Sequence, residues 1–456
     1  MCLPKTNKCR GGVYPPKAAN KTRRDTARRV RKKKTLLALL ALKNRINQNK
    51  NTTMKTNVGV VFGGRSVENE ISVITANQAM AAMDTEKYEI TPIYITKEGK
   101  WYTGEALRNV ANYRDPKKLL AMCEEVYMKP IYGDTNLYRT KKGMFQKEVV
   151  TRLDVILPAL HGTNCEDGTF QGVMEFSGIP YTGCNTLASA NGMDKITMKM
   201  ILKECGIPVI DYYWFSDKEW SDKQDETVAG IEAKLGYPVI VKPANSGSSV
   251  GIRAAHNREE LLDAVDYAIS FTSRVIIEKY VQKLKEVNCA VLGNYYECQP
   301  SVCEVPVRSG EILSYQDKYM NGGGKQSQGM QSTVREIPAN LPKESTDFIQ
   351  KAACDTFRAL SCDGVARIDF IIDEATGDIF VNEINTIPGS LSFYLWEYSG
   401  ISFTALIDRL IEIAFRRKQD AGFKAVNYGE NIFAAKSTGG AKTGGKMGGG
   451  KFGAKM

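Results

Sequence analysis

The sequence predicts an α/β protein in which sheets and helices form layers, divided into about three domains. Between residues 57 and 420, apolar strand-like runs alternate with segments of helical periodicity, which is the pattern of layered α/β folds. The chain has 456 residues, enough for about three domains of ordinary size. Its 43% hydrophobic and 25% charged content is typical of a globular protein. A mostly disordered chain and a collagen-like chain are therefore excluded.

The net charge of +11 belongs to the two ends of the chain and not to its body. Residues 1–50 hold sixteen Lys and Arg and one acid, and residues 421–456 hold six Lys and one acid. Residues 51–420 hold 40 basic and 49 acidic side chains, so the body is acidic. The Gly- and Lys-rich end, 421–456, cannot bury a core and is expected to be a flexible tail. We likewise expect residues 1–56 to be a disordered basic extension.

Three interpretations of the basic extension remain open. It is rich in Arg and nearly free of acids, which fits a transit peptide, and its charge also fits a nucleic-acid-binding arm. In the third interpretation it is upstream sequence without a folded role, because Met54 stands directly before the first strand-like run. We favour the third.

Cysteine spacing and hydropathy predict the compartment. The eleven cysteines are scattered with no C-x-x-C pair, so neither a disulfide framework nor a structural zinc site is indicated. The longest uncharged apolar run, residues 35–42, is far shorter than the roughly 20 residues that cross a bilayer. We therefore expect a soluble, cytoplasmic protein with no membrane insertion.

The first domain is predicted at 57–185. Residues 58–62 form a buried strand, and the helix that follows begins near Glu68. Residues 155–160 form a second buried strand. A stretch rich in turn residues at 184–194 marks the boundary to the next domain.

The second and third domains are predicted at 186–278 and 279–420. In the second domain, residues 194–205 have the pattern of a helix and residues 237–241 that of a strand. In the third domain, beyond Tyr280, the pattern becomes more typical of antiparallel strands.

The sharpest local pattern lies near the end of the third domain. Strand-like runs at 364–372 and 379–385 flank a turn centred on Thr376, which predicts a β-hairpin. Side chains alternate along a strand, so the face of each side chain follows from its position. One face should hold Arg367 and Asp369 from the first strand, and Val381, Glu383 and Asn385 from the second.

The register of this hairpin predicts a magnesium site. A turn centred on Thr376 places Asp369 opposite Glu383 and Arg367 opposite Asn385. Hard oxygen ligands with few carboxylates are what Mg²⁺ prefers when it also binds phosphate. The alternative is an ordinary salt-bridged sheet face, in which the two acids would repel each other with a single Arg to offset them. We favour the magnesium site.

A loop of small residues after an apolar strand predicts phosphate binding. Lys242 ends the strand and leads into residues 244–251, ANSGSSVG, whose backbone N–H groups can cover phosphate oxygens. The spacing is not that of a P-loop, so that class is excluded. Glu278, near the end of a later strand, could accept a hydrogen bond from an exocyclic amine. These features together favour a nucleotide pocket.

The combined motifs resemble the ATP-grasp superfamily and, within it, the D-alanine:D-alanine ligase family. The resemblance is carried by the runs GGRSVENEIS at 63–72 and HGTNCEDG at 161–168, by Lys195, Lys242 and its Gly/Ser loop, Glu278 with Lys279, and the hairpin residues Arg367, Asp369, Glu383 and Asn385. It covers residues 57 to about 419. It implies a three-domain ATP-grasp architecture with an N-terminal Rossmann-like domain.

The resemblance also implies ATP as a substrate, bound between the second and third domains, together with two Mg²⁺ ions or, alternatively, Mn²⁺. The implied nucleotide-binding residues are Lys195, Lys242 and Ser248 near the phosphates, Glu278, Lys279 and Val281 near the adenine, and Glu286 at the ribose. The implied metal ligands are Asp369, Glu383 and Asn385.

The implied reaction joins two D-alanines through an acyl phosphate, for peptidoglycan precursors. The implied catalytic residues are Glu68, Ser248, the lid tyrosine Tyr319, and Arg367 with the Gly389 N–H for the oxyanion. The implied substrate-binding residues are Glu68 for the first ammonium, His161 beside it, Lys318, and either Ser392 or Tyr394 for the second carboxylate. A homodimer is the usual state of the family.

Three departures from the family pattern affect the second substrate or its cover. Cys165 stands where the family usually has Gly, the family's serine falls on Tyr394 by ungapped counting, and the lid is longer than usual. D-serine or D-lactate therefore stays open as the acceptor, although Tyr319 favours D-alanine, because the D-lactate-using relatives typically carry a histidine there.

Two rival functions remain. One is a nucleic-acid-binding protein that acts through its basic arm, against which the intact set of motif residues argues. The other is an ATP-grasp ligase that activates a different carboxylate. Glu68 and His161 distinguish the favoured hypothesis, D-alanine ligation, from this second rival.

Overall fold

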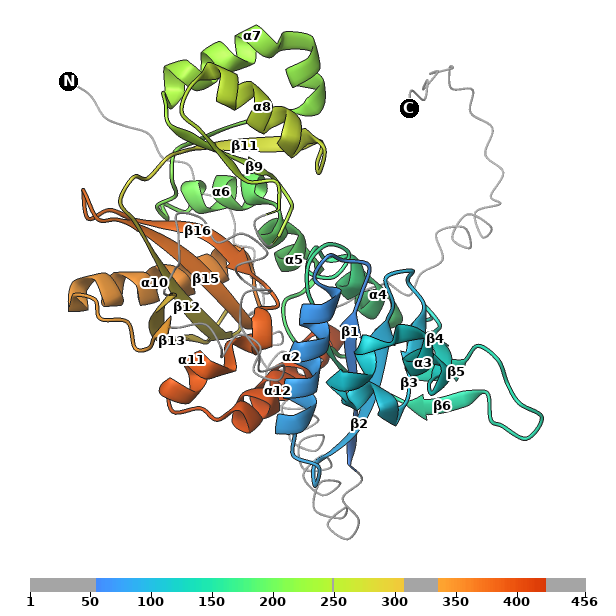
Figure 1. Cartoon of the computed structure of the whole chain (residues 1–456). Coiled ribbons are helices and arrows are strands. Elements are labelled where there is room, and N and C mark those ends of the chain that lie inside the picture. The colour runs from blue at the N-terminus through green and yellow to red at the C-terminus, as the bar shows by residue number, and fades with distance from the viewer. Residues whose placement is uncertain (1–54, 248–249, 307–334, 424–456) are drawn as a thin grey trace, which may run out of the picture. The chain divides into compact units, whose positions relative to one another are not determined.

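We describe the protein from a computed structural model, in which residues 55–247, 250–306 and 335–423 are described (Figure 1). Most of the expected basic extension, 1–56, and of the expected tail, 421–456, lies outside the described part. The first strand already begins at Thr56 and the last helix continues to Gly422, so the folded part is slightly longer than expected at both ends. Among the described residues, no helix is long and apolar enough to cross a membrane.

The first part of the described chain forms a seven-stranded sheet in the order β6-β5-β4-β3-β2-β1-β7. Its strands are β1 (Thr56–Gly63), β2 (Tyr88–Ile95), β3 (Trp101–Thr103), β4 (Glu124–Met128), β5 (Asn136–Arg139), β6 (Val149–Arg152) and β7 (Val155–Leu160). The helical elements are α2 (Asn69–Ala82), η1 (Glu105–Arg108), η2 (Val110–Arg114), α3 (Pro116–Ala121) and α4 (Thr169–Ser177). β1 pairs in parallel with β2 and β7, as in a Rossmann-like layer, and the other pairs are antiparallel.

The middle of the chain forms a four-stranded antiparallel sheet in the order β10-β9-β11-β8. Its strands are β8 (Tyr212–Ser216), β9 (Val239–Pro243), β10 (Arg253–Ala255) and β11 (Arg274–Lys279). Its helices are α5 (Thr186–Met193), α6 (Lys195–Glu204), α7 (Asp217–Lys234) and α8 (Arg258–Ile269). The turn-rich stretch at 184–194 therefore contains a helix. Its turn residue Asn185 caps α5, because the Asn185 side chain accepts from the Ala188 N–H at 2.9 Å.

The last part forms a five-stranded sheet in the order β14-β13-β12-β15-β16. The strands are β12 (Leu284–Gly293), β13 (Cys298–Pro306), β14 (Arg335–Glu336), β15 (Gly364–Asp373) and β16 (Ile379–Asn385). The helical elements are α10 (Lys343–Ala359), η4 (Gly389–Ser392), α11 (Phe393–Tyr398) and α12 (Phe403–Gly422). All strand pairs here are antiparallel, which confirms the prediction for the region beyond Tyr280.

A β-bulge corrects one part of the hairpin prediction. The predicted pairs of Asp369 with Glu383 and of Arg367 with Asn385 are present, but Phe370 pairs with Val381, so Asn382 is an extra residue in β16. The prediction that Val381 shares a face with Glu383 is therefore wrong. The bulge turns Val381 into the core beneath the sheet, where Val381 is 1% exposed, and leaves Glu383 on the opposite face.

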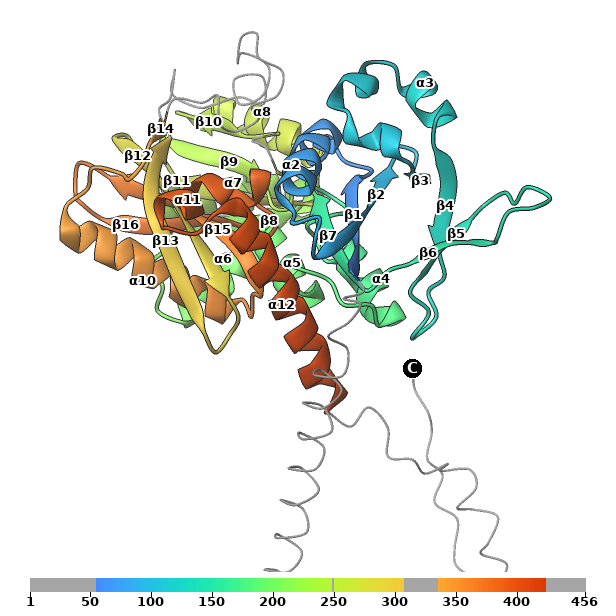
Figure 2. The same cartoon turned by 90° about the horizontal axis from the view of Figure 1, so that it is seen from below.

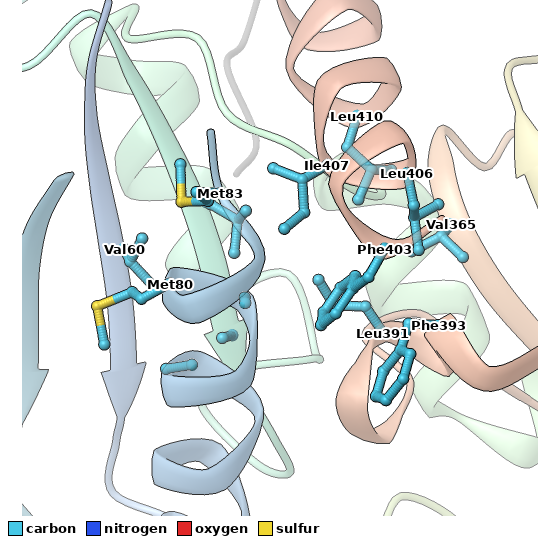
Figure 3. Packing of buried hydrophobic residues seen from close by; sticks show 14 of the residues in the cluster. Val60, Met80, Met83, Val365, Leu391, Phe393, Phe403, Leu406, Ile407 and Leu410 are labelled. Atoms are coloured by element: carbon cyan, nitrogen blue, oxygen red, sulfur yellow. The ribbon is translucent and has the colours of Figure 1, made fainter. Parts of the chain in front are cut away.

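A continuous hydrophobic cluster joins the first sheet to the C-terminal helices. α12 contacts α2 and β7 as well as β15, and Figures 1 and 2 both show it between these elements. In Figure 3, Met80 on α2 lies beside Val60 of β1, whereas Leu391 and Phe403 lie on the other side of α2. The Phe393 and Phe403 rings stack with centroids 4.5 Å apart. This packing holds η4 beside α2, which matters for the site.

Candidate active site

Two predicted phosphate-binding lysines converge from different elements. Lys195 is the first residue of α6, and its Nζ donates to the Ser246 carbonyl at 2.8 Å and lies 3.7 Å from Glu383 Oε2. Lys242, on β9, has its Nζ 2.7 Å from Glu278 Oε2. Lys195 thereby links the small-residue loop to the predicted metal ligands.

Glu278 is the centre of a buried charge network. It lies on β11, is 2% exposed, and bridges Lys242 Nζ and Lys199 Nζ, the latter at 2.9 Å from its Oε1. Burial by itself would raise the pKa of Glu278, but the charges of Lys199 and Lys242 outweigh it and lower this pKa to about 2. The predicted adenine contact of Glu278 stays a prediction. Its side chain holds the phosphate-side Lys242 in place.

Lys199 is a site residue that the sequence analysis missed. It lies one helical turn after Lys195 on α6 and is fully buried. Two lysines at this spacing on one helix repel each other unless an acid lies nearby, which is the signal that sequence reasoning could have used. The acid is Glu278, 79 residues further along the chain.

The predicted metal ligands lie together on the paired strands β15 and β16. Arg367 grips Asp369 through two hydrogen bonds, from Nε at 2.6 Å and from Nη2 at 2.7 Å. The Asn385 side-chain amide donates to Asp369 Oδ2 at 3.0 Å. Arg367 and Lys195 thus offset the two facing carboxylates.

This donor set fits Mg²⁺ by its chemistry. It offers two carboxylates and one amide on a single face of the hairpin, half-buried beside Lys195. Within the described ranges no cluster of three or more His, Cys, Asp or Glu forms a cage for a metal ion. A site with few protein ligands and room for phosphate oxygens suits Mg²⁺ better than a structural metal.

Glu68 lies where the loops after two strands meet. It is 7% exposed and precedes the first residue of α2. A Cβ atom on Gly162 would lie 2.6 Å from Glu68 Oε2, and one on Gly247 would lie 3.3 Å from it. Only a glycine backbone can come this close at Gly162, which has a φ of +79°. The predicted neighbour Ser248 lies outside the described residues, directly after Gly247.

His161 is a neutral, buried hydrogen-bonding residue. It is 4% exposed, and its Nε2 lies 2.7 Å from the Thr75 hydroxyl. Burial lowers the pKa of His161 to about 4, although a hydrogen bond from the ring to the Ile387 backbone partly offsets this. The His161 ring is therefore hydrogen-bonded within the protein, and a direct role of His161 at the substrate stays a prediction.

The departure at Cys165 is accommodated without strain at that residue. The left-handed position of this turn is taken by Asn164, with a φ of 63°. Cys165 is 2% exposed and packs in the core of the seven-stranded sheet, close to Gly64. The Cys165 backbone itself is not left-handed, so a side chain is tolerated at this position.

The two candidates for the second carboxylate differ in their surroundings. The Tyr394 hydroxyl donates to Glu304 Oε1 at 3.0 Å, so it is already engaged by an acid. The Ser392 hydroxyl is fully buried and has no hydrogen-bond partner among the described residues. This contrast favours Ser392 as the residue that keeps a donor available.

The remaining predicted residues are placed as follows. Lys279 is exposed at the end of β11, and Val281 is half-buried in the connection that follows. Glu286 is half-buried on β12, and Gly389 is the first residue of η4. Lys318 and Tyr319 lie outside the described residues.

These features define an ATP-grasp ligase: a charge-rich site between two antiparallel sheets, next to a parallel-containing sheet that supplies Glu68. The family model described as D-ala D-ala ligase N-terminus matches residues 57–184, and that described as D-ala D-ala ligase C-terminus matches residues 201–412. The chain therefore belongs to the D-alanine:D-alanine ligase family.

Individual relatives agree over most of their length. A D-alanine:D-alanine ligase of Acetivibrio thermocellus is 40% identical over 378 residues, covering 80% of this chain and 97% of that protein. One from Thermosipho melanesiensis is 38% identical, covering 83% and 99%. Among solved structures, the VanG D-Ala:D-Ser ligase of Enterococcus faecalis is 31% identical, with a TM-score of 0.67 over 79% of this chain and 100% of that chain. The ligase of Coxiella burnetii is 27% identical, with a TM-score of 0.66 over 81% and 96%.

Proposed function

We propose that this enzyme joins two D-alanines to D-alanyl-D-alanine at the expense of ATP, for peptidoglycan precursors. The observation that carries the proposal is the face of the hairpin on which Asp369 and Glu383 pair beside Lys195. The curated relatives bear this activity in their names, and a structural neighbour from Bacillus anthracis, 27% identical with a TM-score of 0.56 over 80% of this chain and 100% of that chain, is a complex with ATP.

The nucleotide phosphates would lie between Lys195 and Lys242, whose ammonium groups neutralise their charge. Asp369, Glu383 and Asn385 would hold Mg²⁺, which when bound supplies further charge neutralisation on the phosphates. Glu278 and Lys199 keep the Lys242 ammonium in a fixed position.

The donor D-alanine would be held by Glu68 at its ammonium group. Its carboxylate oxygen attacks the γ-phosphorus, which gives an acyl phosphate and ADP. The amine of the acceptor D-alanine then attacks the carbonyl carbon. Arg367 and the Gly389 N–H stabilise the oxyanion that forms, and phosphate leaves.

Several finer points belong to the same proposal. The three sheets support domains at 57–185, 186–278 and 279–420. All nine cysteines of the described part are free, which suits the cytoplasm. Exposed apolar side chains on the adjacent helices α4 and α5, at Val173, Phe176 and Leu187, suit a homodimer, which light scattering of the purified protein would detect.

The test is ADP release by the purified full-length protein with D-alanine alone, then with D-serine or D-lactate added. Glu383→Gln should lower ADP release roughly a hundred- to a thousand-fold, as expected for losing several kcal/mol of charge stabilisation. The matched control is Glu374→Gln, at an exposed acid in the turn of the same hairpin, which should keep wild-type activity.

Three outcomes would redirect the proposal. Turnover that requires D-serine or D-lactate would change the acceptor, which the similarity to a D-Ala:D-Ser ligase makes a specific alternative. No turnover with any D-amino acid would refute the ligase. Salt-sensitive nucleic-acid binding that disappears on removing residues 1–53, and that Glu383→Gln leaves unchanged, would support the rival that acts through the basic arm.

A further inference from the structure

The segment from Thr386 to Gly389 is flanked by contacts with α2 and with the loop after β7. It follows the end of β16 and leads into η4, so it carries the backbone N–H that stabilises the oxyanion in the proposed reaction. Glycine has no side chain with which to fix its own position. The neighbours on both sides of Gly389 must therefore supply the anchoring contacts.

Glu166 anchors the segment before Gly389. Its Oε1 accepts from the Ile387 N–H at 3.1 Å, and its Oε2 accepts from the Gly162 N–H at 2.8 Å. The Thr386 hydroxyl donates to the Glu166 carbonyl at 3.4 Å. Glu166 thus ties the chain after β16 to the loop after β7.

Thr75 anchors the segment after Gly389. Its hydroxyl oxygen accepts from the Ser390 N–H at 3.0 Å and lies 2.7 Å from His161 Nε2. Thr75 therefore joins the Ser390 backbone to the His161 ring, which also hydrogen-bonds the Ile387 backbone. Thr75 and His161 are 1% and 4% exposed, so water does not compete for these bonds.

The residues directly after Gly389 adopt a backbone that they do not prefer. Ser390, Leu391 and Ser392 have φ values of 53°, 51° and 51°. A left-handed conformation costs a non-glycine residue roughly 1–2 kcal/mol. Such a run persists only where the surroundings over-determine it. The Leu391 side chain lies in the cluster with α2, and the Thr75 hydroxyl, on the same helix, holds the Ser390 N–H (Figure 3).

We propose that Thr75 is a positioning residue for the oxyanion N–H of Gly389, with Glu166 anchoring the other side of that glycine. The inference rests on the proposed function. The amine nitrogen of the acceptor forms a bond to the acyl carbon, and the carbonyl electron pair moves to oxygen. When that pair returns, the carbon–oxygen bond to phosphate breaks, and the amine proton leaves with the phosphate. Only this second half-reaction develops the oxyanion, so the first should depend less on Thr75.

The test compares Thr75→Val, which keeps the shape and removes the hydroxyl, with the conservative Thr75→Ser. Two rates are measured during turnover with D-alanine: ADP release, and positional isotope exchange within ¹⁸O-labelled ATP, which reports acyl-phosphate formation alone. In Thr75→Val we expect ADP release to fall about 10- to 100-fold, while exchange stays within about threefold of the wild type. Thr75→Ser should restore ADP release to within about threefold of the wild type.

The matched control is Thr404→Val. The Thr404 hydroxyl donates to the Ala82 carbonyl at 2.7 Å, so its loss removes a threonine hydrogen bond between α12 and the end of α2, away from the site. ADP release and exchange should both match the wild type. Glu166→Gln provides a second test, because the oxygen of the new amide can accept from only one of the two N–H groups that Glu166 binds. Like Thr75→Val, this substitution should raise the ratio of isotope exchange to ADP release.

The outcomes separate the two proposals. Equal losses of exchange and ADP release in Thr75→Val, or no loss of either, would refute the positioning role while leaving the ligase in place. A wild-type protein that releases no ADP with D-alanine would refute the proposed function and this inference with it.

Discussion

Two buried networks support the site, one made of charges and the other of neutral groups. The first joins Lys199, Glu278 and Lys242 between α6, β9 and β11. The second joins Thr75 and His161 to the Ser390 N–H, between α2 and η4. The region around the two predicted phosphate-binding lysines is thus stabilised by ion pairs, and the region around η4 by neutral hydrogen bonds.

The difference shows what each network depends on. A buried ion pair is worth little relative to apolar packing, but breaking it by removing one partner leaves an uncompensated charge. A neutral hydrogen-bond network avoids that penalty and fails instead when one member changes its protonation state. Three changes probe this contrast, in order of expected effect.

The largest effect is expected from Glu278→Gln, which leaves the Lys199 and Lys242 ammoniums buried without their carboxylate. The free energy of unfolding should fall by about 3–5 kcal/mol, measured by denaturant titration. The control is Glu297→Gln at an exposed acid of the loop before β13, which should change stability little. A loss below about 1 kcal/mol would show that charge compensation by Glu278 is not what stabilises this region.

The second change tests the neutral network through pH. The pKa of His161 is about 4 in the folded protein, against 6.5 for an unperturbed histidine. The unfolded chain therefore takes up a proton near pH 6.5, while the folded protein does so only near pH 4. The stabilising contribution is complete above pH 6.5 and is lost as the pH falls, by about 3 kcal/mol at pH 4.

His161→Gln should remove this part of the pH dependence, because the Gln amide can still hydrogen-bond with Thr75, in either direction, but does not titrate. The measurement is the free energy of unfolding at several values between pH 4 and 6.5. The exposed His256, the other histidine of the chain, provides the control substitution His256→Gln. If the free energy of unfolding changed with pH equally in the wild type and in His161→Gln, a buried neutral His161 would be contradicted.

The smallest effect is expected at a hydrogen bond from a neutral side chain, where the first sheet meets α12. The Tyr88 hydroxyl donates to Asp408 Oδ1 at 2.8 Å; Tyr88 is 9% exposed and Asp408 is half-buried. Tyr88→Phe should cost about 1 kcal/mol of unfolding free energy, because Asp408 keeps its ion pair with Lys87 and stays partly accessible to water. Tyr127→Phe, at an exposed tyrosine of β4, should cost less. A cost equal to that of Glu278→Gln would contradict the distinction between losing a neutral hydrogen-bond donor and leaving buried charges uncompensated.

Local patterns were sufficient for much of the fold and for the pairing of the predicted metal ligands Asp369 and Glu383. The strands at 155–160 and 379–385 lie where the sequence predicted them, and Asp369 faces Glu383 as predicted. These features depend on side-chain alternation and turn position, which a short window of sequence contains. The face on which Val381 lies was not predictable in this way, because side-chain alternation gives no sign of a bulge.

The supporting residues were missed because their partners are distant in sequence. Thr75 bonds Ser390, 315 residues away, and Glu166 bonds Ile387, 221 residues away. In the sequence, Thr75 has no feature that distinguishes it from other helix residues. The role proposed for it follows only from the packing of α2 against η4. Glu166 lies inside a recognised motif, yet nothing local indicates that its carboxylate binds two backbone N–H groups.

The bulge at Asn382 also fixes how long this hairpin must be. With the extra residue, Val381 of β16 lies in the interior and Glu383 lies on the opposite face, near Lys195. The Asn382 side chain accepts a hydrogen bond from Lys242 Nζ at 3.2 Å. Deleting one residue between Asp378 and Glu383 would move the side chains of half the strand from the buried face to the opposite face, and the reverse. Insertions or deletions should therefore be excluded here during divergence, whereas the exposed tip around Met144 and Phe145 is free to vary in length.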